Sequence, residues 1–152
     1  MNDYLLTYEQ VANAAEYVAS QLTKNKYKIK RLVAISRGGL IPTGLLAQHL
    51  NIREIHSLAL YSYLPDGTQG DITVLVTPNV PDEPETLFVD DLVDGGKTAA
   101  YLKQTYPNAS FVPLFSKKLS DDFIVNPCLV PQNSNVIFPW ELKTTKNRAR
   151  DR

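Results

Sequence analysis

The stretch that decides the fold is residues 86–102, TLFVDDLVDGGKTAAYL. It opens with the apolar run LFV (87–89), which predicts a strand buried on both faces of a sheet. Asp90 and Asp91 follow at the expected end of this strand, and a helical pattern begins at Thr98. The stretch therefore predicts a strand, an acidic edge, a glycine turn and a helix N-terminus in immediate succession.

The turn between strand and helix is Asp94-Gly95-Gly96-Lys97-Thr98. Backbone N–H groups at a helix N-terminus lack intrahelical partners, and the helix dipole adds positive character there. Such a turn is a candidate phosphate site. The carboxylates beside it could hold sugar hydroxyls or a hydrated Mg²⁺, an ion that prefers oxygen ligands and keeps several waters. The alternative is an ordinary turn with solvated acids.

A second turn repeats this arrangement with a basic residue. Residues 31–36, RLVAIS, predict a strand, and a helix is expected from Ile41 to about Leu50. Between them lies Ser36-Arg37-Gly38-Gly39, whose two glycines allow the backbone to approach a ligand closely. A guanidinium binds phosphate through a fork of donors, so the turn suits a diphosphate. The alternative is a plain turn whose arginine pairs with a surface acid.

The two turns together resemble those of the phosphoribosyltransferases. A Walker A loop and a G-x-G-x-x-G fingerprint are both absent from the sequence. In the resembling family an acidic pair ends a strand, and a third acid opens an Asp-Thr-Gly-x-Thr turn. Asp90 and Asp91 match the pair and Asp94 matches the third acid, whereas Gly95 stands where the family usually has a hydroxyl.

Residues 34–42, AISRGGLIP, look like the pyrophosphate loop of the bacterial xanthine-guanine phosphoribosyltransferases, and the resemblance extends from about residue 31 to 141. It implies an α/β fold of the type I phosphoribosyltransferase kind, with a mostly parallel central sheet and helices on both faces. It also implies one domain over residues 1–142, in which the N-terminal segment and residues 120–142 form a small hood.

The resemblance assigns roles to the residues of both turns. Asp90 and Asp91 would hold ribose hydroxyls or metal waters, with Asp91 as the metal residue. Asp94 would also be the general base for the purine N7 proton. The turn from Asp94 to Thr98 would bind the 5′-phosphate, and Ser36, Arg37 and Gly38 would bind pyrophosphate.

The resemblance also assigns base-binding residues. Lys117, after the expected strand 110–117, would donate to the six-position oxygen of guanine, xanthine or hypoxanthine, because an ammonium has only donors. Asn135 stands where the family has a tryptophan that stacks on the purine, and the carbonyl of Val136 could meet an exocyclic amine. Phe138, or a tyrosine from elsewhere, is the candidate replacement for the missing ring.

Other segments carry simpler expectations. Thr7 and Gln10 stand in capping-box relation at the start of an expected helix over 7–24. Strands are expected over 55–61 and 72–76, joined by a loop over 62–71 that resembles the family's mobile lid and begins with Ser62-Tyr63. A lid would keep water away from the sugar carbon as it becomes cationic. Residues 77–85 read as an exposed connector without chemistry.

Composition narrows the classes of protein further. The chain has 152 residues and a net charge of +0, which suits one domain and does not favour a general nucleic-acid binder. The single Cys128 excludes an internal disulfide and a cysteine-based zinc site. A basic n-region and a membrane-length apolar run are absent, so a cytoplasmic protein is expected. The basic tail, residues 143–152, is expected to be disordered.

The resemblance implies transfer of phosphoribosyl from phosphoribosyl pyrophosphate (PRPP) to a 6-oxopurine, with release of pyrophosphate and Mg²⁺ as cofactor. It also implies a homo-oligomer, a dimer or tetramer, with no membrane or nucleic-acid partner. Two alternatives remain open. One is a regulator that senses PRPP or a nucleotide without turnover, and the other is an RNA-binding regulator that uses basic surface.

Overall fold

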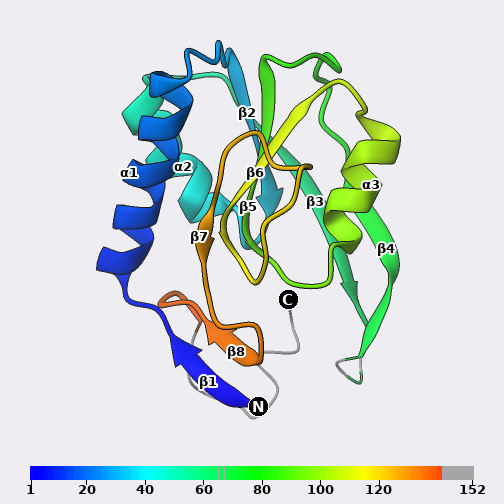
Figure 1. Cartoon of the computed structure of the whole chain (residues 1–152). Coiled ribbons are helices and arrows are strands. Elements are labelled where there is room, and N and C mark those ends of the chain that lie inside the picture. The colour runs from blue at the N-terminus through cyan, green and yellow to red at the C-terminus, as the bar shows by residue number, and fades with distance from the viewer. Residues whose placement is uncertain (65, 67, 142–152) are drawn as a thin grey trace.

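The computed structural model describes residues 1–64, 66 and 68–141, and a six-stranded sheet forms its centre (Figure 1). The strand order is β4-β3-β2-β5-β6-β7. Neighbouring strands are parallel except β3 and β4, which are antiparallel. The predicted mostly parallel α/β sheet is therefore confirmed. The bounds are β2 Arg31–Ser36, β3 Ile55–Tyr63, β4 Gln69–Val76, β5 Thr86–Val93, β6 Ser110–Ser116 and β7 Cys128–Leu129.

Helices cover both faces of the sheet (Figure 1). The helices α1 (Tyr8–Lys24) and α2 (Leu40–Leu50) pack on one face, and α3 (Lys97–Thr105) packs on the other. Side chains of β5 alternate between the faces, as strand geometry requires. Leu87 and Val89 enter the α1–α2 side of the core, while Phe88 enters the α3 side. The prediction that this strand is buried on both faces is confirmed.

A second, two-stranded sheet lies near the carboxyl ends of the central strands (Figure 1). We call this sheet the hood; it consists of β1 (Asn2–Leu5) and β8 (Ser134–Ile137), paired in parallel. Phe138 follows β8 and is fully buried, stacked on Trp140 with ring centroids 4.6 Å apart. The suggestion that Phe138 replaces a base-stacking ring is therefore wrong, because the core already covers it. The basic tail lies outside the described residues.

The expected lid loop is shorter than the sequence suggests. β3 continues to Tyr63 and β4 begins at Gln69, and these two residues pair across the hairpin. Asp66 Oδ1 accepts hydrogen bonds from the backbone N–H and the hydroxyl of Thr68, which closes the turn. The prediction placed the strand ends too early because cross-strand pairing extends through polar residues that a hydropathy pattern assigns to a loop.

The connector over residues 77–85 has a structural role that its sequence does not reveal. Asp82 Oδ1 accepts hydrogen bonds from the N–H groups of Asn108 and Ala109, each at 2.9 Å, ahead of β6. Glu83 pairs with Arg31 at 2.6 Å, and this hydrogen bond raises the pKa of Arg31 above its ordinary value. The partners are distant in sequence, so only the fold brings them together.

The first helix has a well-defined start and end. Thr7 and Gln10 form both hydrogen bonds of the predicted capping box. At the other end, Lys26 N–H donates to Thr23 O and Tyr27 N–H donates to Leu22 O. These two bonds form a Schellman motif, in which the residue after the C-cap takes the left-handed conformation. Lys26 holds that position at a φ of 59°.

We expect Lys26→Gly to stabilise the protein by roughly 0.5–1 kcal/mol, because glycine adopts a positive φ without the steric cost of a Cβ. Urea unfolding followed by circular dichroism measures the change. Lys28→Gly is the matched control: Lys28 has no positive φ, so that variant should be neutral or less stable. Equal effects of the two substitutions would contradict the assignment.

Candidate functional site

Three central strands end side by side beneath the hood (Figure 1). Because β2, β5 and β6 are parallel neighbours, their carboxyl ends meet at one edge of the sheet. The segments that follow them are the turn 36–39, the turn 94–98 and Lys117. The fold thus gathers at one edge the three segments that the sequence singled out.

The turn after β2 lies directly against the acids of β5. A Cβ placed on Gly38 would lie 2.6 Å from Cγ of Asp91, and one on Gly39 would lie 2.7 Å from the carbonyl oxygen of Ile35. A side chain at Gly39 would collide with backbone, and one at Gly38 would collide with the Asp91 carboxylate, so both glycines allow a close approach. The Ser36–Arg37 peptide bond is cis, and Arg37 is exposed. Two predicted groups, the pyrophosphate turn and the acidic pair, are therefore in contact.

The acidic pair lies within β5 instead of at its end. Asp90 and Asp91 are 9% and 8% exposed, and β5 continues to Val93 because Leu92 and Val93 still pair with β6. Asp90 Oδ1 accepts a hydrogen bond from Asp91 N–H at 2.8 Å, and Asp91 Oδ1 accepts one from Leu92 N–H at 2.6 Å. The backbone therefore orients both carboxylates.

Lys117 joins the end of β6 to the other two parts of the site. Its ammonium lies 3.2 Å from Oδ2 of Asp94 and donates to the carbonyl oxygen of Ser134 in the hood at 2.6 Å. The Lys117 side chain is 7% exposed, whereas that of Asp94 is 53% exposed. A nearly buried cation thus has an acid on one side and the hood on the other.

The turn before α3 has the geometry expected of an anion site. Gly96 is the N-cap at a φ of 81°, a conformation that favours glycine. Having no side chain, it cannot cap the helix, and α3 begins at Lys97, one residue before the prediction. Gly95 is exposed and Thr98 is half-buried. The ammonium of Lys97 donates to the carbonyl oxygen of Gly70 on β4 at 2.5 Å.

The remaining predicted residues lie on β3 and in the hood. Ser62 and Tyr63 belong to β3, and Val136 belongs to the hood strand β8, where it is buried. Asn135 donates from Nδ2 to Oδ1 of Asp3 on the neighbouring hood strand at 3.1 Å. The sequence analysis did not identify Asp3. Asp3 and Asn135 lie far apart along the chain, so no local pattern links them.

Gly70 and Ser134 were also missed. Each contributes only a backbone carbonyl, a group that every residue carries, so residue type could not have marked them. Ser57 was missed as well: its hydroxyl donates to Oγ of Ser36 at 3.0 Å and supports the turn after β2.

The side chains that could hold a metal ion at this edge of the sheet are Asp90 and Asp91. Within the described part of the chain, no three His, Cys, Asp or Glu side chains cluster to hold an ion. These two carboxylates could hold Mg²⁺, which typically binds one or two carboxylates together with substrate phosphates.

Cys128 is a separate case. Burial raises the pKa of the Cys128 thiol, which disfavours the reactive thiolate.

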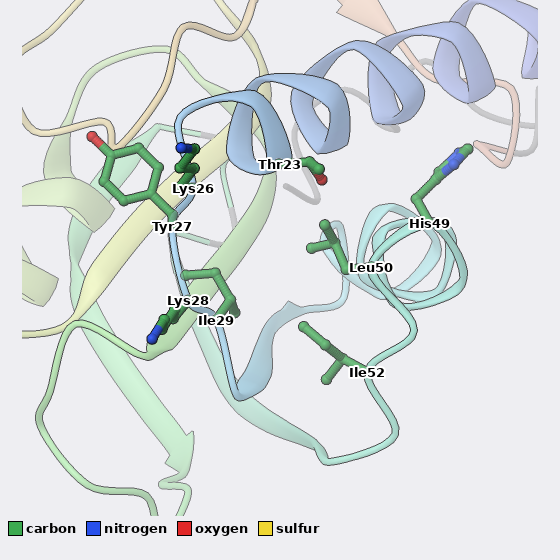
Figure 2. A pocket seen from close by; sticks show the side chains of 8 residues that line it. All are labelled: Thr23, Lys26, Tyr27, Lys28, Ile29, His49, Leu50 and Ile52. Atoms are coloured by element: carbon green, nitrogen blue, oxygen red, sulfur yellow. The ribbon is translucent and has the colours of Figure 1, made fainter.

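A pocket of about 490 Å³ lies elsewhere, between the C-terminal ends of α1 and α2 and the segment before β2 (Figure 2). Leu50 and Ile52 face the pocket, whereas Tyr27 and Lys28 point away from them (Figure 2). The lining combines these apolar side chains with polar ones such as Thr23 and His49. None of the site residues that the sequence predicts lines this pocket.

Comparison with solved structures identifies the architecture. A purine phosphoribosyltransferase from Pyrococcus horikoshii is 22% identical, with a TM-score of 0.72 over 95% of this chain and 97% of that chain. The xanthine-guanine-hypoxanthine phosphoribosyltransferase of Helicobacter pylori is 20% identical, with a TM-score of 0.68 over 93% and 95% of the two chains. This chain has the phosphoribosyltransferase fold.

A third neighbour with the same architecture is a protein from Neisseria gonorrhoeae with bound ppGpp. It is 20% identical, with a TM-score of 0.68 over 99% of this chain and 96% of that chain. No protein-family model matches the sequence. The structural comparison thus shows the phosphoribosyltransferase fold although the sequences of these proteins are only weakly similar to this one.

No helix within the described ranges is long and apolar enough to cross a membrane.

We expect Gly38→Ala to destabilise this phosphoribosyltransferase-like chain by roughly 1–3 kcal/mol, because the new methyl group overlaps the Asp91 carboxylate. Gly44→Ala is the matched control. Gly44 lies in α2 with no atom near an added Cβ, so alanine should stabilise by about 0.5–1 kcal/mol. Urea unfolding of both variants measures the free energies. A neutral Gly38→Ala would show that the β2 turn and the β5 acids are not in close contact.

Proposed function

We propose that this protein transfers phosphoribosyl from PRPP to a 6-oxopurine and releases pyrophosphate. The observation that carries the proposal is the Asp94–Lys117 ion pair, which joins the candidate phosphate turn to a buried cation under the hood. The phosphoribosyltransferase fold and the purine enzymes that share it support the reaction class. In the proposal the protein is cytoplasmic and acts as a homo-oligomer.

The two turns divide the PRPP molecule between them. The N–H groups at the start of α3 hold the 5′-phosphate, and Thr98 adds a hydroxyl in the same turn. Arg37, with the amides of Ser36 and Gly38, holds the pyrophosphate and stabilises its charge as it leaves. Asp90 and Asp91 accept hydrogen bonds from the ribose hydroxyls. Backbone N–H groups already hold their carboxylates in fixed orientations.

Asp91 would also hold Mg²⁺ through a water or an oxygen, and the metal would neutralise part of the charge on the diphosphate. The carboxylate lies against the Gly38 backbone of the pyrophosphate turn. This contact supports the proposal that one acid serves both the metal and the turn.

Lys117 selects the base. An ammonium has three donors and no acceptor, and two of its contacts are Ser134 O and the Asp94 carboxylate. The remaining N–H would donate to the six-position oxygen of guanine, xanthine or hypoxanthine. Adenine carries an amine at that position, and this amine could not accept the hydrogen bond. Asn135 and the carbonyl of Val136 would face the other edge of the base.

In the proposal, Asp94 accepts the proton. The purine N9 forms its bond to C1′ of the ribose as the bond from C1′ to the pyrophosphate oxygen breaks. The N7 proton passes to the Asp94 carboxylate, which is half-exposed and held by Lys117. Positioning and charge stabilisation then account for most of the rate, and the β3–β4 hairpin with Ser62 and Tyr63 would exclude water.

The direct test is pyrophosphate release from PRPP and Mg²⁺ with guanine, xanthine, hypoxanthine, adenine or uracil. Turnover with one or more 6-oxopurines and none with adenine or uracil is the expected result. The ranking among 6-oxopurines measures what Asn135 does in place of a stacking ring. Turnover with adenine in preference to the oxopurines would contradict the role of Lys117.

We expect Asp94→Asn to lower kcat by roughly 10²–10⁴-fold, the usual contribution of a general base, while the Kd for PRPP changes little. Steady-state pyrophosphate release and isothermal titration calorimetry measure the two quantities. Asp122→Asn is the matched control, since Asp122 pairs with Lys103 on the surface. An Asp94→Asn enzyme with unchanged kcat would exclude Asp94 as the base.

A second candidate is a regulator that binds PRPP or a nucleotide without turnover. The neighbour with bound ppGpp has the same fold over nearly the whole chain, which favours nucleotide binding as such. Gly95 and Asn135 remove two contacts that the resembling enzymes use. Tight binding of PRPP or ppGpp without turnover of any base would support this candidate over the enzyme.

A further inference from the structure

Lys97 occupies a position that disfavours its charge. It is the first residue of α3, where the helix dipole is positive, and no acid lies in the first turn. The ammonium does not point into solvent as a helix surface lysine does. It crosses to β4 and donates to the carbonyl oxygen of Gly70 at 2.5 Å, and Lys97 is half-buried.

Gly70 lies on the hairpin side of β4, the antiparallel strand at the edge of the sheet. A Cβ on Gly70 would lie 2.8 Å from Cδ2 of Leu64, so the Leu64 side chain packs closely on Gly70 at this end of the hairpin. The Lys97–Gly70 bond therefore ties the turn 94–98 to the turn end of the β3–β4 hairpin. It does so with one flexible side chain.

We propose that Lys97 is a latch that couples phosphate in the turn 94–98 to the position of the β3–β4 hairpin. This inference rests on the proposed function, because it requires a phosphate to occupy that turn. A phosphate dianion accepts a charge-assisted hydrogen bond more strongly than a neutral carbonyl does. The Lys97 side chain starts within the turn and is long and flexible, so its ammonium can reach an anion bound there.

The expected consequence is an exchange of partners. With the turn empty, Lys97 holds Gly70 and fixes the hairpin. With phosphate bound, the ammonium turns to the anion, the Gly70 carbonyl loses its donor, and the hairpin is free to move over the ligand. Lys97 is thus a positioning residue, acting through the hairpin and not on the reacting atoms.

The first arm of the test uses the free protein. The N–H of Asp71 belongs to the same peptide unit as the carbonyl of Gly70, so its NMR resonance reports a hydrogen bond to that oxygen. Lys97→Met should shift this resonance and speed amide exchange at Asp71 by about tenfold or more, as loss of a charge-assisted bond implies. Lys103→Met removes a charge from the same helix, where Lys103 pairs with Asp122, and should leave Asp71 unchanged.

The second arm adds ribose 5-phosphate. In the unaltered protein the Asp71 resonance should move toward its position in Lys97→Met, and exchange there should quicken. In Lys97→Met the ligand should leave Asp71 where it was. An Asp71 amide that stays in place, or becomes more protected, at saturation would overturn the latch, because Lys97 would then keep its bond to Gly70.

The amides of Gly96 and Thr98 report binding in the turn itself and separate the two hypotheses. If they shift with ribose 5-phosphate and Asp71 does not, the latch alone is refuted. If they do not shift at any ligand concentration, the phosphate site of the proposed function is refuted, and the latch, which requires that site, is refuted as well. An unaltered Asp71 in free Lys97→Met would refute the latch regardless of binding.

Discussion

The site depends on one nearly buried cation. Lys117 at the end of β6 bonds to the hood through Ser134 O and to the turn after β5 through Asp94. A buried ammonium is costly unless it is paired and hydrogen-bonded, so both partners must be in place. The hood, the central sheet and the turn after β5 are therefore held in one relative arrangement by this side chain.

The glycines serve the same edge of the sheet by a different physical route. Gly38 allows the turn after β2 to lie against the Asp91 carboxylate, and Gly96 supplies the positive φ that directs the chain into α3. Neither position gains stability from a side chain. Their role is to let the backbone of these turns lie close to the carboxylates at this edge of the sheet.

The three helices and five of the central strands were predictable because each follows from a local pattern. The short strands β1, β7 and β8 were not predicted, because each is defined by pairing with a distant segment. The apolar run at 87–89, the capping box of α1 and the glycine turns were all read correctly along the chain. The strand bounds were predicted wrongly where pairing with a strand distant in sequence extends an element beyond its local pattern. β5 runs on through Asp90 and Asp91 because β6 pairs with it, and the hairpin extends to Tyr63 because Gln69 pairs with it. Phe138 was offered as a stacking ring, although Phe115 and Trp140 enclose it.

The sequence by itself determined the fold class and the residue types available at the site, since periodicity, turn glycines and carboxylates are properties of short segments. Only the tertiary structure decided which of these groups meet. Lys117 pairs with Asp94 and donates to Ser134 O, and Lys97 donates to Gly70 O. These partners are far apart along the chain, so no local pattern predicts the contacts. Two of these partners are backbone carbonyls, which every residue carries. Their identity is set by strand order and register alone.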